Sequence, residues 1–289
     1  MKTLREYIHE ARANRTALGH FNVGTFEMFS AVVAAARATD MPVVIGVSEG
    51  ERDVFGVHTI AAIVREVRER TGHPVFLNAD HTYSVERVKE AVAAGFDSVI
   101  FDGAQLPLEE NIAKTKECVL YARASGRDVL IEGELGFIGT GSQLLDVIPE
   151  GAAVTEDVMT KADDARRFTE ETGVDLFAPA VGNLHGTLKT GSDPRLSIPR
   201  IREISGAVSV PLVLHGGSGT TDDDYRDAIR AGISLVHVST ELRRAFRQAL
   251  MQSLTELPEE MAPYKYIRPA AQAVEAVVIA RMRLFAGQA

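Results

Sequence analysis

The stretch Ala93–Val99, AAGFDSV, ends a helical pattern at a glycine and passes directly into a strand pattern. The stretch Arg230–Val236, RAGISLV, repeats this order of helix, glycine and strand. A glycine at the end of a helix adopts the left-handed conformation that lets the chain turn into the next element. The repetition predicts an α/β fold in which helices alternate with parallel strands.

Eight short runs carry this pattern along the chain. They are Ala17–Asn22, Val43–Val47, Val75–Ala79, Ser98–Phe101, Val129–Gly133, Leu176–Pro179, Leu212–Leu214 and Leu235–Val238. The runs are mostly apolar without alternation, as expected of parallel strands buried on both faces. Helical patterns between them include Phe26–Thr39, His58–Arg70, Val85–Ala94, Glu109–Ala124, Ala162–Glu171 and Asp222–Ala231. Eight units without a low-complexity linker favour a closed (β/α)8 TIM barrel over the alternative, an open doubly wound sheet.

The length of the chain fits one such barrel. Its 289 residues are the usual size, and we expect a single barrel domain over residues 1–289. The start, MKTLREYIHEARANR, predicts an N-terminal amphipathic helix rather than a signal peptide. The glycine-rich segment of about 136–159 is too long for a plain βα loop and predicts a lid. A C-terminal helical extension of about 258–289 carries an apolar stripe that the barrel or another subunit must cover.

Charge and composition narrow the class of partner and compartment. The net charge of −9 argues against nucleic acid or an anionic membrane as the main partner. No apolar run approaches the roughly 20 residues that a membrane-spanning helix needs. The single cysteine, Cys118, excludes an internal disulfide framework and is expected in the core. These features predict a cytoplasmic enzyme.

Histidines and carboxylates gather at the predicted carboxyl ends of the strands, where barrels place their active sites. The motifs are Asn78–His81, Glu132–Glu134, Asn183–Gly186, His215–Gly219 and His237–Thr240. Three neutral imidazoles, from His81, His185 and His215, would leave a fourth position open on zinc, as a catalytic site requires. The four histidines outside these motifs, His9, His20, His58 and His73, receive no predicted role.

The motif HGGSG predicts an anion site beside the metal. Consecutive glycines let backbone N–H groups approach a ligand, and the helix that follows Thr221 adds a positive dipole end. Barrels often hold phosphate after the seventh strand. Ser239 and Thr240 at the end of the eighth strand could supply further donors, and Lys189 could add a cation.

A metal beside an anion site suits a phosphorylated ketone, whose carbonyl the metal polarises while a base moves a proton. Asp80, adjacent to His81, is the candidate for proton transfer. On a regular strand the two side chains would point to opposite faces, so both serve one site only if the strand bends.

These motifs, in this order, resemble the class II, zinc-dependent ketose-bisphosphate aldolases, which include fructose-bisphosphate and tagatose-bisphosphate aldolases. The matching segments are GHFNVGTFE from Gly19, GVSEG from Gly46, ADH from Ala79, EGELG from Glu132, NLHG from Asn183, LVLHGGSG from Leu212 and STELRRAF from Ser239. The resemblance covers nearly the whole chain and implies a divergent member that forms or cleaves a carbon–carbon bond next to dihydroxyacetone phosphate. It implies a zinc-stabilised enediolate and one zinc per subunit. A monovalent cation, Na⁺ or K⁺, and a homodimer or homotetramer also occur in the family.

The resemblance implies a role for each matching residue. His81, His185 and His215 would bind zinc, with Glu134 and Asp102 as ligands in alternative positions, and Asp80 would be the proton donor in cleavage. The residues implied to contact substrate or its phosphate are Gly186, Lys189, Gly216, Gly217, Ser218, His237, Ser239, Thr240, Asn22 and Ser48.

The chain departs from the family pattern where the family contacts substrate. The last strand usually ends in the motif Asn-Val-Asn/Asp-Thr, which here reads His237-Val238-Ser239-Thr240. His237 could donate a hydrogen bond in place of the asparagine, act as an acid or base, or simply pack. The lid usually carries acidic residues, whereas Gly141, Ser142 and Gln143 lie near those positions and the nearest acid is Asp146.

Two further departures concern the C-terminal segment and the third strand. The C-terminal arginine for a distal phosphate is absent from Arg268–Gln272, and Thr82 replaces the glycine that usually follows the histidine. We therefore expect an acceptor aldehyde other than glyceraldehyde 3-phosphate. A metal-dependent sugar-phosphate isomerase or epimerase is the alternative.

Overall fold

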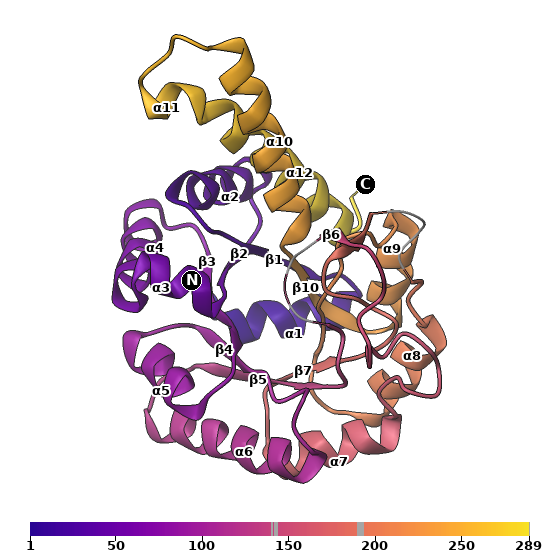
Figure 1. Cartoon of the computed structure of the whole chain (residues 1–289). Coiled ribbons are helices and arrows are strands. Elements are labelled where there is room, and N and C mark those ends of the chain that lie inside the picture. The colour runs from indigo at the N-terminus through magenta and orange to yellow at the C-terminus, as the bar shows by residue number, and fades with distance from the viewer. Residues whose placement is uncertain (140, 142–143, 190–193, 289) are drawn as a thin grey trace.

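The computed structural model describes residues 1–139, 141, 144–189 and 194–288. Eight parallel strands close into a barrel in the order β1-β10-β9-β7-β5-β4-β3-β2, ringed by helices (Figure 1). These strands are β1 (Leu18–Asn22), β2 (Val43–Val47), β3 (Val75–Thr82), β4 (Ser98–Phe101), β5 (Leu130–Leu135), β7 (Leu176–Pro179), β9 (Leu212–Leu214) and β10 (Ile233–Val238). The predicted (β/α)8 barrel is confirmed, and each of the eight predicted runs overlaps one of its strands.

The helices follow the predicted alternation, with additional short ones. They are α1 (Leu4–Asn14), α2 (Phe26–Thr39), α3 (Glu49–Phe55), α4 (Val57–Thr71), α5 (Val85–Ala94), α6 (Leu108–Ala124), α7 (Ala162–Thr172), α8 (Ile198–Ala207), α9 (Asp222–Ala231), α10 (Thr240–Glu256), α11 (Pro263–Tyr266) and α12 (Arg268–Phe285). Left-handed Gly95 ends α5 and leads into β4, as the AAGFDSV pattern predicts. None of these helices is long and apolar enough to cross a bilayer.

Helix α1 closes the amino-terminal end of the barrel. Thr3 and Glu6 form a reciprocal capping box that starts the helix. Its apolar face, made by Leu4, Ile8 and Ala11, packs against inward-facing side chains near the strand starts, and the barrel ring frames this helix in Figure 1. The opposite, carboxyl-terminal end of the barrel therefore remains the end where a site can form.

The predicted lid is anchored to the segment after β7. Two short strands, β6 (Leu144–Leu145) and β8 (Thr187–Leu188), pair in parallel outside the barrel. This ladder connects the lid to the loop that follows His185, and periodicity does not predict it because each strand has only two residues. Ser142 and Gln143, the lid positions singled out above, lie outside the described residues.

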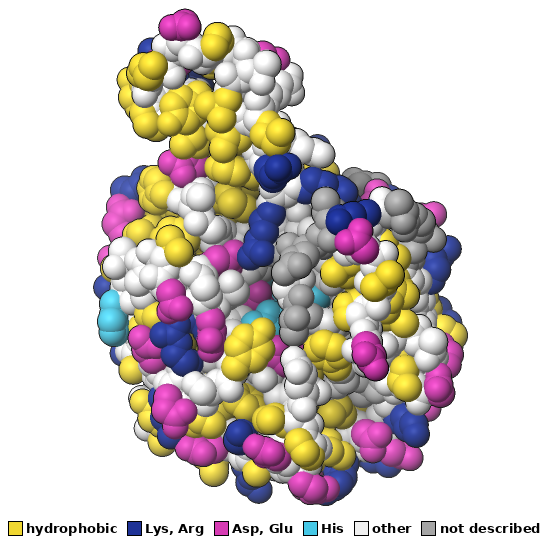
Figure 2. Space-filling model, viewed as in Figure 1, with side chains coloured by type: hydrophobic (Ala, Val, Ile, Leu, Met, Phe, Trp, Pro, Cys, Tyr) yellow, Lys and Arg dark blue, Asp and Glu magenta, His cyan; other side chains and the backbone are white. Residues whose placement is uncertain are grey.

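The C-terminal extension forms an arm with α10 that projects from the barrel (Figure 1). Helix α12 packs on α2 and α10. Its buried side chains are Ala270, Val274, Val278, Met282, Leu284 and Phe285. The barrel and the neighbouring helix α10 therefore cover the apolar stripe of α12, whereas the tip of the arm exposes apolar side chains (Figure 2).

Candidate active site

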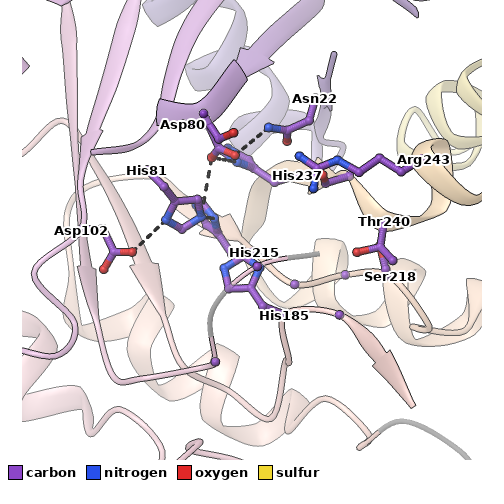
Figure 3. A pocket seen from close by; sticks show the side chains of 18 of the residues that line it. Asn22, Asp80, His81, Asp102, His185, His215, Ser218, His237, Thr240 and Arg243 are labelled. Carbon is purple, nitrogen blue, oxygen red and sulfur yellow. Dashed lines mark hydrogen bonds and ion pairs between the residues drawn. The ribbon is translucent and has the colours of Figure 1, made fainter. Parts of the chain in front are cut away.

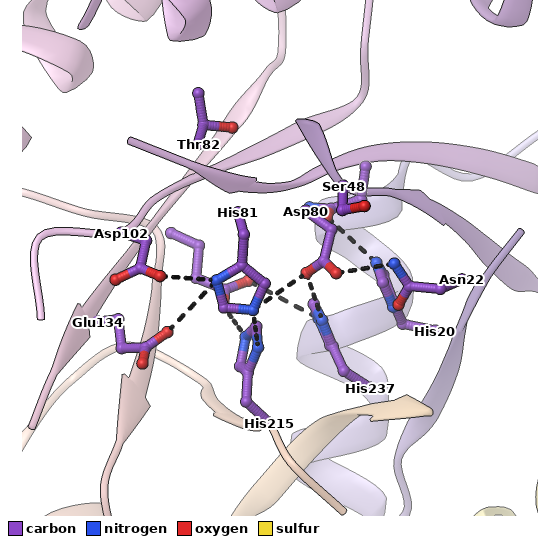
Figure 4. A network of polar contacts seen from close by, with 12 residues as sticks. His20, Asn22, Ser48, Asp80, His81, Thr82, Asp102, Glu134, His215 and His237 are labelled. Carbon is purple, nitrogen blue, oxygen red and sulfur yellow. Dashed lines mark hydrogen bonds and ion pairs between the residues drawn. The ribbon is translucent and has the colours of Figure 1, made fainter. Parts of the chain in front are cut away.

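The end of β3 turns two adjacent side chains, Asp80 and His81, into the same site (Figure 4). His81 has a φ of 81°, and the register of β3 with β4 shifts between Ala79 and Thr82. A left-handed conformation at a residue other than glycine costs about 1–3 kcal/mol and persists only where the surroundings impose it. The bend that the sequence requires for Asp80 and His81 to act together is therefore present, and β3 extends to Thr82 rather than ending at Ala79.

Three histidines meet at the carboxyl end of the barrel (Figure 3). The Nε2 atom of His81 lies 3.1 Å from the Nδ1 atom of His215. His81, His185 and His215 each offer a ring nitrogen within 4.8 Å of the other two. They come from the ends of β3, the segment after β7 and the end of β9, so the convergence predicted from the sequence is realised.

The chemistry of this donor set fits a divalent metal. Burial and the neighbouring His81 lower the pKa of both His185 and His215 to about 3, so both rings are neutral, the form that binds metal. The Nε2 atom of His185 is buried without a hydrogen-bond partner among the described residues. Such an atom needs an explanation, and a metal ligand position provides one.

In His81 and His215, the ring nitrogen that points away from the other histidine contacts a carboxylate. Asp102 contacts His81 Nδ1 at 2.9 Å, and Glu132 contacts His215 Nε2 at 2.6 Å. Such partners orient metal-binding imidazoles and strengthen them as ligands. Glu134 lies 4.0 Å from His81 Nδ1, so Asp102 and Glu134 approach the same side of that ring.

Glu132 is a site residue that the sequence analysis did not assign. It is fully buried, and burial raises its pKa to about 7. It lies two positions before Glu134 on β5, so both side chains share the inward face. The spacing of two residues between Glu132 and Glu134 on one strand indicates that Glu132 also points into the barrel.

Asp80 is held by two hydrogen bonds. Asn22 Nδ2 donates to its Oδ2 at 2.8 Å, and His237 Nδ1 lies 3.2 Å from its Oδ1. Burial acts to raise the pKa of Asp80, but His81 and His237 outweigh burial and hold that pKa well below its usual range. The carboxylate is therefore ionised and oriented at neutral pH.

His237 is backed by a second histidine, His20, to which the sequence analysis gave no role. Their rings stack with centroids 3.5 Å apart, and His20 Nε2 lies 3.1 Å from Asn78 Oδ1. A Cβ atom on Gly46 would lie 2.1 Å from His20 Cε1, so glycine is needed there. In the structure His237 contacts Asp80 and packs on His20, and its predicted contact with substrate stays a prediction.

The glycine-rich loop after β9 exposes its backbone toward the site. Gly216 has a φ of 61°, and a Cβ atom there would lie 2.5 Å from the carbonyl oxygen of Leu184. The Tyr225 hydroxyl donates to the carbonyl of Gly217 at 2.6 Å and fixes the loop from behind. A bare, fixed backbone of this kind can bind an anion through its N–H groups.

One cavity collects most of the predicted site residues. It is lined by Asn22, Ser48, Asp80, His81, Asp102, His185, Gly186, His215, Gly216, Gly217, Ser218, His237, Ser239 and Thr240. Glu134 lies behind His81 rather than at the cavity surface. Lys189 also lies outside the lining, where its ammonium group pairs with Asp146 at 2.9 Å.

The cavity also contains residues that the sequence analysis did not single out. They are Glu49, Gly50, Tyr83, Gly139 and Arg243. Arg243 is the only lysine or arginine in the described lining, and its guanidinium pairs with Glu51 at 2.6 Å. It lies three residues after Thr240 on α10, a spacing that places both on one helix face and could have indicated it.

A barrel that combines three histidines able to hold a metal, an adjacent ionised carboxylate and a loop able to bind an anion fits an enzyme that acts on phosphorylated sugars. The family model for class II fructose-bisphosphate aldolase matches residues 2–288, and the chain belongs to this family. The resemblance inferred from the motifs is thereby confirmed, and the protein is a class II aldolase.

Curated relatives and solved structures are similar to this chain over nearly its whole length. Fructose-bisphosphate aldolase from Geobacillus stearothermophilus is 36% identical, with 98% of this chain and 96% of the relative covered. Fructose-bisphosphate aldolase from Staphylococcus aureus strain Mu50 is 35% identical over the same shares. The crystal structure of the YdjI aldolase from Escherichia coli K12 is 30% identical with a TM-score of 0.82, covering 98% of this chain and 96% of that chain.

Proposed function

We propose that this aldolase depends on zinc and uses dihydroxyacetone phosphate as the donor half of its substrate. The observation that carries the proposal is the pair Asp80 and His81, which the left-handed turn brings into one cavity. A protein that only bound sugar phosphates would not need a metal ligand beside an ionised carboxylate.

Different residues of the site would bind the metal and the phosphate. His81, His185 and His215 would hold one zinc ion, and Asp102 and Glu134, which form a second group with His81, would be ligands in an alternative position. When bound, zinc would polarise the ketone carbonyl and stabilise the negative charge that develops after proton removal. The phosphate would lie against the N–H groups and hydroxyls of Gly186, Gly216, Gly217, Ser218, Ser239 and Thr240.

Asp80 would move the proton of the reacting hydroxyl. In cleavage, the bond between carbons 3 and 4 breaks, its electron pair stays on the donor half, and the proton of the hydroxyl on carbon 4 passes to Asp80. The lowered pKa of Asp80 favours this accepting role in cleavage over the donor role implied by the resemblance. In condensation, Asp80 returns the same proton to the oxygen of the aldehyde.

Among the described residues, Arg243 is the one lysine or arginine that lines the cavity and could meet a second phosphate on the acceptor half of the substrate. Arg268 begins α12 with an exposed side chain and is not among the described residues that line the cavity. Arg243 in the lining is already paired with Glu51. Losing a bidentate arginine should weaken the binding of a second phosphate. We therefore propose an acceptor other than glyceraldehyde 3-phosphate, and cleavage of fructose 1,6-bisphosphate at rates typical of enzymes would overturn that part.

Deuterium exchange tests the donor half alone. The zinc-loaded enzyme in deuterated water should exchange the hydroxymethyl proton of dihydroxyacetone phosphate, and a chelator should abolish the exchange. No exchange with zinc fully bound would contradict the proposed mechanism. A panel of aldehydes then identifies the acceptor, and interconversion of sugar phosphates without aldehyde release would instead favour the isomerase or epimerase alternative.

We also propose that the protein forms a homodimer or homotetramer through the projecting arm. The arm exposes large apolar side chains, namely Met251, Leu254, Leu257, Met261 and Tyr264. Figure 2 shows hydrophobic side chains gathered on the projecting part of the molecule. Exposed apolar patches of this kind mark interaction sites. In light scattering after size exclusion, Leu254→Lys combined with Met261→Lys should lower the mass to that of the monomer, whereas an unchanged oligomer would contradict this assignment.

A further inference from the structure

Arg52 is a fully buried cation next to the site that the proposed mechanism does not use. It lies on α3 with 1% of its surface exposed. Its Nη1 donates to the carbonyl oxygens of Val47 at 2.8 Å and Asp80 at 3.0 Å, and its Nη2 donates to Thr82 Oγ1 at 3.0 Å. A buried arginine is costly unless its donors are satisfied, and here they connect the ends of β2 and β3.

These contacts straddle the left-handed residue. Asp80 precedes His81 and Thr82 follows it, and Arg52 bonds to both. The register of β3 with β2 ends at Ala79, and its register with β4 skips from Ala79 to Thr82. Arg52 thus contacts β3 where its strand pairing is interrupted.

Thr82 provides the hydrogen-bond acceptor on the C-terminal side of His81, while Asp80 provides the one on the N-terminal side. It stands where the family usually has glycine, its side chain is fully buried, and its hydroxyl accepts from Arg52. A planar guanidinium can bond to several acceptors at once in a fixed arrangement, which an ammonium group cannot do.

We propose that Arg52, together with the Thr82 hydroxyl, is a positioning residue that holds the left-handed turn at His81. It thereby keeps the His81 imidazole and the Asp80 carboxylate in the same cavity. This inference rests on the proposed function, because it assigns His81 to the metal.

The test measures zinc binding directly. Arg52→Met and Thr82→Val are compared with the unaltered protein by titrating the metal-free forms with zinc against a chromogenic chelator, well below their melting temperatures. We expect Arg52→Met to weaken zinc binding about 10–100-fold, as loss of a residue that orients ligands does, and to lower kcat with little change in KM. Thr82→Val, which removes only the hydroxyl, should weaken it about tenfold.

Arg68→Met is the matched control. Arg68 also donates to a β3 carbonyl, that of Val75 at 2.8 Å, and pairs with Asp97, but it acts at the opposite end of the strand. We expect it to lower the melting temperature without changing zinc affinity.

The outcomes separate the inference from the proposed function. Wild-type zinc affinity in both Arg52→Met and Thr82→Val, or an equal loss in Arg68→Met, would overturn the positioning role. If Arg52→Met does not fold, Thr82→Val alone decides. A failure of the unaltered protein to bind zinc would contradict the proposed metal site itself and the inference with it.

Discussion

Replacing Asp80 with asparagine should lower kcat for aldol cleavage about 10³-fold, within the range typical of losing a general acid or base. Asparagine keeps the shape of the side chain, and its Oδ1 can still accept from Asn22, which donates to Asp80 at 2.8 Å. It cannot take up a proton. The loss should therefore appear in kcat, while KM and zinc content stay close to those of the unaltered enzyme.

Zinc content and the variant Asp163→Asn are the controls for that experiment. Asp163 lies in the first turn of α7, and 86% of its side chain is exposed. Its replacement should leave kcat unchanged. Retention of full activity by Asp80→Asn with zinc bound would remove Asp80 from the reaction and leave His237 as the candidate.

Removing the metal should abolish cleavage, with a fall of at least about 10³-fold, because a bound metal supplies several kcal/mol of charge stabilisation. Dialysis against a chelator or the variant His185→Ala should have the same effect. Zinc should restore the dialysed enzyme and not the variant. Equal activity before and after complete metal removal, checked by elemental analysis, would contradict the proposal.

The pH dependence of metal removal follows from His81. Burial acts to lower its pKa, but Asp80, Asp102 and Glu134 outweigh burial and raise the pKa to about 10 in the metal-free protein. A proton therefore occupies His81 at neutral pH, and a metal must displace it. Apparent zinc affinity should rise as pH increases toward about 10 and fall in acid, so the chelator should strip the enzyme faster at pH 6 than at pH 8. A pH-independent affinity would exclude His81 as a ligand.

The sequence predicts the site residues that lie at the ends of strands. The apolar runs predict where strands stop, and parallel strands in a barrel all end on one rim. The sequence therefore predicts that His81, His215 and His237 lie together. Glu132 lies in one of the rim motifs, but the sequence does not assign its role, and His20 and Arg52 lie outside those motifs. Their roles depend on partners that are distant in the sequence. Glu132 contacts His215, His20 stacks on His237, and Arg52 bonds to Asp80 and Thr82.

The sequence by itself determined the barrel, the three histidines at its rim and the family, because these depend on local patterns and their order along the chain. It also set a condition, that β3 must bend for Asp80 and His81 to share a site. Only the tertiary structure decided how the bend is made. The left-handed turn at His81 costs free energy locally. Arg52, which bonds to the residue before the turn, comes from a different βα unit, 28 residues before Asp80.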